Sequence, residues 1–113
     1  MIINGKEFDF DIADVDNMER YEKALHDMQD TAKNAKKGLS TVENARLICK
    51  GARDFFDTVL GDGKSKDIFG EKDNVRTAYD VLEKFIEDCS KEYESINNRF
   101  NKYSSNRAQR RQQ

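Results

Sequence analysis

The segment Val59–Lys66 contains Gly63, Lys64 and Ser65, which match the last three residues of a phosphate-binding P-loop. In that loop, backbone N–H groups and the lysine bind nucleotide phosphates, and a further glycine must stand five positions before the Gly-Lys pair. Here that position is occupied by Thr58. The segment also follows an apolar run with helical spacing instead of a strand, so we interpret it as a helix end followed by a turn.

Acidic side chains near the amino terminus raise the question of a calcium site. They are Asp9, Asp11, Asp14 and Asp16. A calcium-binding EF-hand loop needs ligands at fixed positions, a central glycine and a closing glutamate, and neither this cluster nor residues 62–73 fits that pattern. We interpret the cluster as the solvated face of a strand followed by a helix cap, and we expect no metal and no cofactor.

A cysteine nucleophile would require Cys49 or Cys89 to lie beside His26, the single histidine of the chain. Both cysteines fall on the apolar stripes of predicted helices, where cysteine behaves as a small hydrophobe. No secretory signal is recognised at the amino terminus, so both thiols are expected to be reduced and buried. No catalytic arrangement follows from the spacing of the residues, and we predict that the protein is not an enzyme.

Positive charge is concentrated at the carboxyl end, although the net charge of the chain is −2. Residues 99–113 contain no acidic residue and five basic ones: Arg99, Lys102, Arg107, Arg110 and Arg111. Such an end could touch nucleic acid or an acidic protein surface. The overall acidity and the lack of interleaved aromatic residues argue against nucleic acid. We predict that residues 105–113 form a basic flexible tail. It either keeps this end soluble and suits the C-terminal dipole of the preceding helix, or its three arginines contact a protein partner.

A single helical domain, residues 1–104, is expected to carry these features. Its 113-residue chain contains no proline, which suits long helices. Asn4-Gly5 predicts a tight turn, and the alternation of Phe8, Phe10 and Ile12 with acidic residues predicts a strand after it, so residues 1–12 should form a β-hairpin. No apolar run approaches the ~18 residues that span a bilayer. A location in the cytoplasm without membrane contact is therefore expected.

Helical periodicity predicts helices over residues 14–37, 41–60 and 74–103. Asp14 or Asp16 should cap the first helix, Ser40 with Glu43 the second, and Asp73 the third. Residues 61–73 should form a loop with a short turn that inserts Ile68 and Phe69 into the core, and Gly51 suggests a close helix crossing. The expected fold is mainly α: an N-terminal β-hairpin followed by a three-helix antiparallel bundle with a long C-terminal helix.

The third helix is predicted to be longer than the body that it packs against. About 30 residues extend ~45 Å, whereas the other two helices extend ~30 Å. The carboxyl end should therefore overhang and present four large apolar residues: Tyr93, Ile96, Phe100 and Tyr103. Monomers rarely leave such a patch open, so either the N-terminal hairpin or another chain should cover it, and we favour another chain.

Four segments also resemble a family of small phage and prophage proteins encoded among the tail genes of bacteriophages of Gram-positive bacteria. They are residues 4–11 (NGKEFDFD), 18–24 (MERYEKA), 55–63 (FFDTVLGDG) and 68–70 (IFG). The resemblance covers residues 1–90 and implies a tail-assembly-chaperone type of protein, which would bind the tape-measure protein and keep it soluble. It does not extend to the arginine-rich end.

Two functions are therefore carried forward. The leading one is a non-enzymatic phage protein that acts in tail assembly through coiled-coil-like contacts with itself or with a helical client. The alternative is a phage protein that binds and inhibits or regulates a host protein, because such proteins are also small, acidic and helical. A nucleic-acid contact through Arg107, Arg110 and Arg111 is the third hypothesis, and its binding should weaken steeply with salt.

Overall fold

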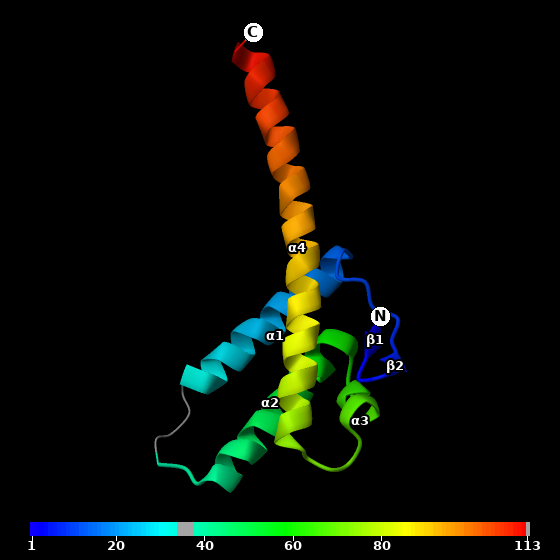
Figure 1. The fold of residues 1–113 in the computed structure, drawn as a ribbon, viewed down its shortest axis with the longest axis vertical. Helices are drawn as coiled ribbons and strands as arrows, with labels where there is room; N and C mark the ends of the chain where they lie inside the picture. Colours follow the sequence, from blue (N-terminus) through cyan, green and yellow to red (C-terminus); the bar gives the residue numbers. More distant parts are fainter. Residues whose placement is uncertain (34–37, 113) are drawn as a thin grey trace.

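The computed structural model describes residues 1–33 and 38–112, with side chains described as far as Ser104 at the carboxyl end. The elements are β1 Ile2–Ile3, β2 Lys6–Glu7, α1 Val15–Lys33, α2 Thr41–Leu60, α3 Lys64–Phe69 and α4 Val75–Gln112. The predicted fold class, mainly helical with an N-terminal strand pair and a long C-terminal helix, is confirmed. Helices α1 and α2 run antiparallel to each other, and α4 crosses them obliquely (Figure 1).

The predicted turn of the hairpin is present, but its strands are shorter than expected. Asn4 and Gly5 both have positive φ, 51° and 77°, as a two-residue hairpin turn requires. Only Ile2 pairs with Glu7 and Ile3 with Lys6. The Asn4 side chain donates to the Ile68 carbonyl over 2.8 Å, which fixes the turn against α3.

The alternation of residues 8–12 proves not to be a strand. Phe8 and Phe10 are half-buried and Ile12 is buried, so the apolar side chains do enter the core. They do so from an irregular segment, which ends where the Asp11 carboxylate accepts from the Ala13 N–H over 3.0 Å. The pattern correctly indicated which side chains are inward, but that burial needs no ladder of backbone hydrogen bonds.

The helix caps follow the sequence with one correction. Asp14 caps α1 by accepting from the Asp16 N–H over 3.0 Å. Ser40 and Glu43 form the predicted capping box at the start of α2. For α4, the cap is Asn74, whose side chain accepts from the Thr77 N–H over 3.1 Å, and not Asp73. Asp73 instead pairs with Arg53 over 3.0 Å, which ties α2 to the residues before α4.

The capping box gives the first testable prediction. Ser40→Ala removes the side-chain acceptor for the Glu43 N–H and should lower the free energy of unfolding by about 1 kcal/mol. Urea denaturation measures the change. Thr41→Ala, one residue later on the exposed surface, is the control and should change it by less than about 0.5 kcal/mol. Equal stabilities for Ser40→Ala and the original protein would contradict the assigned cap.

The core is an aromatic cluster where the helices meet. The Phe85 ring of α4 lies 5.1 Å from Phe56, 5.8 Å from Phe55 and 6.0 Å from Tyr21, measured between centroids. Helix α3 closes one side of the cluster. As predicted, its Ile68 is buried, and its Phe69 ring packs 5.7 Å from Phe56. Most of these ring pairs are edge-to-face or tilted, which is the arrangement that aromatic quadrupoles prefer.

Helix α4 runs past its predicted end. It continues through Asn97, Asn98 and Tyr103 to Gln112, so residues 105–112, predicted to be a flexible tail, have a helical backbone. Neither glycine nor proline occurs after Gly70, so no strong helix breaker interrupts α4. The first helix was predicted to residue 37 and ends at Lys33, and residues 34–37 lie outside the described ones. No helix within the described ranges is long and apolar enough to cross a bilayer.

Candidate protein-binding surface

Tyr93 marks the point where α4 leaves the body of the protein. Its ring meets Tyr21 of α1 edge-on at 5.7 Å, and its hydroxyl donates to Glu22 Oε1 over 3.2 Å. Sequence analysis placed Tyr93 among the partner-binding residues. The structure places it against its own chain and half-buried, so its first role is to hold α4 on α1.

Beyond this point lies the projecting end of α4, residues 95–112, which extends away from the other elements (Figure 1). Ile96 is half-buried, whereas Phe100 is 63% and Tyr103 66% exposed. Their spacing of four and three residues places them on one face of the helix. The molecule measures 64 × 34 × 20 Å with a radius of gyration of 17.8 Å, against about 13 Å for a compact chain of this size.

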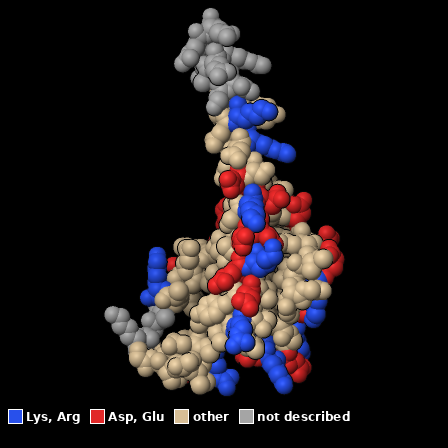
Figure 2. Space-filling view, in the orientation of Figure 1, with Lys and Arg blue, Asp and Glu red and all other residues tan. Residues whose placement is uncertain are grey.

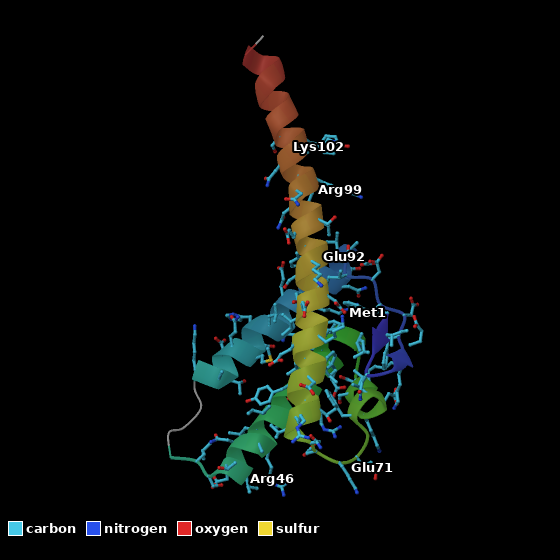
Figure 3. All side chains as sticks on the ribbon, in the orientation of Figure 1. Met1, Arg46, Glu71, Glu92, Arg99 and Lys102 are labelled. Atoms are coloured by element: carbon cyan, nitrogen blue, oxygen red, sulfur yellow. The ribbon has the colours of Figure 1, made fainter. Side chains whose placement is uncertain are left out.

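The N-terminal hairpin does not cover this apolar face. Met1 and the strands lie beside the body, next to α3, while α4 leads away from them (Figure 3). The predicted alternative, in which the hairpin shields Phe100 and Tyr103, therefore does not occur. Both rings remain accessible to another molecule.

Charge is divided between the body and the projecting end. Residues 1–94 contain 15 Lys or Arg and 22 Asp or Glu, a net charge of −7, whereas residues 95–113 contain five and none, a net charge of +5. In Figure 2, the body carries both acidic and basic side chains, and basic side chains lie on the upper part of the described surface of α4. Arg99 and Lys102 lie on the projecting end (Figure 3) and form no ion pair with another described residue. The side chains of Arg107, Arg110 and Arg111 lie outside the described residues, so their predicted role stays a prediction.

A second apolar surface, which the sequence did not reveal, is a groove of 870 Å³ in the body. Its lining comes from the end of α1, the first half of α2 with the preceding Leu39, and the first half of α4. Figure 1 shows that α4 crosses α1 and α2 in this part of the body. Leu47 and Tyr79, both in its wall, are 41% and 45% exposed. The apolar groove is lined mainly by Met28, Leu39, Leu47, Ile48, Tyr79 and Leu82.

Gly51 of α2 lies in the wall of this groove. A Cβ atom built on Gly51 would meet nothing within 4 Å, so no other helix within the described ranges makes the close crossing predicted there. Sequence reasoning missed the groove because Met28, Ile48, Tyr79 and Leu82 have the helical spacing of core residues, and spacing does not show whether the space that they face is filled. The available signal was Leu39 and Leu47, which fall outside this spacing.

The residues that resemble a P-loop are used by the fold itself. The Asp57 carboxylate of α2 accepts from the Ser65 N–H over 2.9 Å, so a side chain of the protein already occupies the start of α3. Gly61 ends α2, with its N–H donating to the Asp57 carbonyl over 3.0 Å. A phosphate at this place would have to displace a carboxylate, which supports the interpretation of the segment as a turn.

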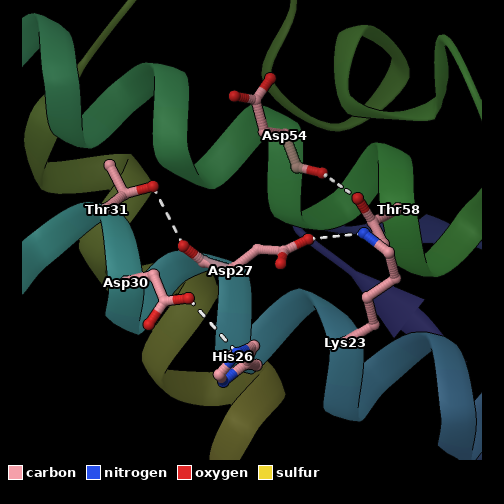
Figure 4. Close-up of polar contacts among 7 residues, drawn as sticks. All are labelled: Lys23, His26, Asp27, Asp30, Thr31, Asp54 and Thr58. Carbon is pink, nitrogen blue, oxygen red and sulfur yellow. Dashed lines mark hydrogen bonds and ion pairs between the residues drawn. The ribbon is translucent and has the colours of Figure 1, made fainter.

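The cysteines and the histidine lie in different environments. Cys49 and Cys89 are buried in the core, and burial raises the pKa of each thiol above its ordinary value, to about 12 for Cys89. His26 lies on the exposed side of α1, where its Nε2 is 3.3 Å from Asp30 (Figure 4). A raised pKa disfavours the thiolate, which is the reactive form, so these thiols are arranged for packing.

The buried Cys89 thiol and Tyr21 phenol should make the folded protein less stable at alkaline pH. Burial raises the pKa of Cys89 from 9.0 and that of Tyr21 from 10.0, each to about 12. The unfolded chain therefore loses these protons first, and the free energy of unfolding should begin to fall above pH 9 and continue to fall toward pH 12. Urea denaturation across this range measures the slope. Cys89→Ala should reduce the part that begins at pH 9, to which the buried Cys49 thiol also contributes, and a constant free energy from pH 8 to 11 would contradict the assignment.

Comparison with known protein families gives one match. Residues 4–113 match the family of unknown function DUF6673, and the chain belongs to this family. Neither a curated protein nor a solved structure matches the chain.

Proposed function

Starting from membership of a family of unknown function, we propose that this protein is a non-enzymatic binding protein whose projecting end holds a helical partner. The observation that supports this proposal most directly is the exposure of Phe100 and Tyr103 on the part of α4 that extends beyond the other elements. Two large rings on one helical face, with a half-buried isoleucine beside them, offer an apolar stripe to a second helix.

The free energy of apolar burial favours a complex in which a partner covers this stripe. Burying a large apolar side chain contributes roughly 1.5–3 kcal/mol, and the exposed rings gain none of it in the isolated chain. Helix–helix recognition through residues spaced four and three apart is a common way to recover that energy. Arg99 and Lys102 beside the stripe would favour a partner with acidic residues along the flanks of its own apolar face.

The more specific form of the proposal rests on the sequence resemblance. We propose that the partner is a long helical client such as a phage tape-measure protein, and that the chain acts as a tail-assembly-chaperone-like protein in the cytoplasm of the host cell. A client holder needs an accessible apolar stripe and a charged exterior, and 37% of the residues of this chain are charged. The phage setting has no support beyond the resemblance.

Co-expression with a tape-measure fragment tests this function. The native chain should raise the soluble yield of the fragment, and the end variant, Phe100→Gln with Tyr103→Gln, should not. The face control, Ser95→Gln with Asn98→Gln, alters the same segment of α4 on another face and should act like the native chain. Equal yields with the native chain and the end variant would contradict the proposal. Retention of one host protein in place of the fragment would favour the alternative, a regulator of a host protein.

A further inference from the structure

The apolar groove is a second surface that no other described residue fills, and its shape is the counterpart of the projecting end. The groove is concave and apolar, with Leu47 and Tyr79 partly exposed in its wall. The projecting end is a single convex helix with an apolar stripe. A groove between helices is a common docking place for an amphipathic helix.

Gly51 indicates that a helix approaches the groove closely. Glycine in a helix interior destabilises it by about 1 kcal/mol relative to alanine. No residue in the described part of the chain requires glycine here, because a Cβ at Gly51 would have open space around it. A helix packed from outside would make use of that space, since small residues let two backbones come close together.

We propose that this groove receives the projecting end of α4 from a second copy of the chain. Opposite charges support this choice of occupant, because a body of net charge −7 would receive an end of net charge +5. Asp30 lies at the groove, where its carboxylate is 3.3 Å from His26 Nε2. Arg99 or Lys102 of the arriving helix would add a permanent positive charge beside this carboxylate. The proposal shares with the proposed function the premise that the projecting end is the binding element.

The projecting end cannot reach the groove of its own chain. Leu82 lies in the groove and Ile96 lies on the projecting end, and both belong to the same uninterrupted helix. Their separation of 14 positions along the helix corresponds to ~21 Å at 1.5 Å per residue, so a straight α4 keeps the two surfaces apart. The contact must therefore form between molecules. Because it joins two different surfaces, each copy would still offer one groove and one end.

Because the contact joins a groove to an end, it can be tested by mixing two full-length variants. Sedimentation and light scattering measure the association. Gly51→Leu places a side chain in the groove but leaves the end intact, and its Cβ would meet no described atom within 4 Å. The end variant, Phe100→Gln with Tyr103→Gln, leaves the groove intact. The native chain should associate, each variant alone should associate at least about tenfold more weakly, and an equimolar mixture should form a 1:1 complex. Thr41→Leu places the same side chain on α2 outside the groove and should associate normally.

Three results would overturn the proposal. They are a native chain that stays monomeric at high micromolar concentration, a Gly51→Leu chain that associates normally, and a mixture of the variants that forms no complex. If the end variant alone loses association while Gly51→Leu keeps it, two ends pair with each other and the groove has another occupant. Co-expression of Gly51→Leu with the tape-measure fragment separates the two proposals, because this variant keeps the projecting end that the client would use.

Discussion

Replacing Phe85 by alanine is expected to lower the free energy of unfolding by about 3–5 kcal/mol, which is a large part of the stability of a small domain. The ring is buried at the centre of the core, with a ring of the N-terminal segment, Phe10, 5.6 Å away and others from α1 and α2 at similar distances. Its removal would leave a cavity between elements that cannot all move inward together. Urea denaturation followed by circular dichroism measures the loss.

Phe100→Ala is the matched control, because it makes the same replacement on the same helix at a side chain that is 63% exposed. It should change the free energy of unfolding by less than about 0.5 kcal/mol. If Phe85→Ala does not fold, Phe85→Leu keeps most of the volume and should still lower the stability by about 1 kcal/mol. Similar losses at positions 85 and 100 would mean that the body is not organised around Phe85.

Local signals allowed much of the fold to be predicted from the sequence. The Asn4-Gly5 turn, the Ser40–Glu43 capping box and the insertion of Ile68 and Phe69 each depend on a few adjacent residues, and each is found as predicted. The prediction failed where neighbouring residues offered the same chemistry. Asp73 and Asn74 are both good caps, and the choice between them was decided by Arg53 of α2, which binds Asp73.

The candidate site, too, could be predicted only in part from the sequence. The exposure of Phe100 and Tyr103 follows from helix length alone, because α4 is longer than α1 or α2 and no body lies beside its end. The position of Tyr93 depends on tertiary packing, since only the path of α1 decides where the body stops. The groove depends on the divergence of α1 and α2, which periodicity does not determine. A hydrophobic pattern states that Met28 and Tyr79 face inward, but not whether the space that they face is filled.

The second large effect is expected at the projecting end, where binding and folding should separate. The end variant, Phe100→Gln with Tyr103→Gln, removes two rings that each contribute roughly 1.5–3 kcal/mol when a partner buries them. Its affinity for the tape-measure fragment, measured by calorimetry, should therefore fall at least about 100-fold. Its free energy of unfolding should stay within about 0.5 kcal/mol of the native value, because both rings are exposed and glutamine is a good helix former.

The face control, Ser95→Gln with Asn98→Gln, makes the comparison specific to the apolar face. It changes two exposed residues of the same segment, keeps the charge of the projecting end at +5 and leaves both rings in place. Its affinity should match that of the native chain. Loss of binding in both variants would point to the helix as a whole or to its charge, whereas unchanged binding in the end variant would remove Phe100 and Tyr103 from the site. Because Phe85→Ala should reduce folding and the end variant should reduce only binding, the pair of experiments tests whether this protein keeps its stabilising rings and its binding rings on separate halves of one helix.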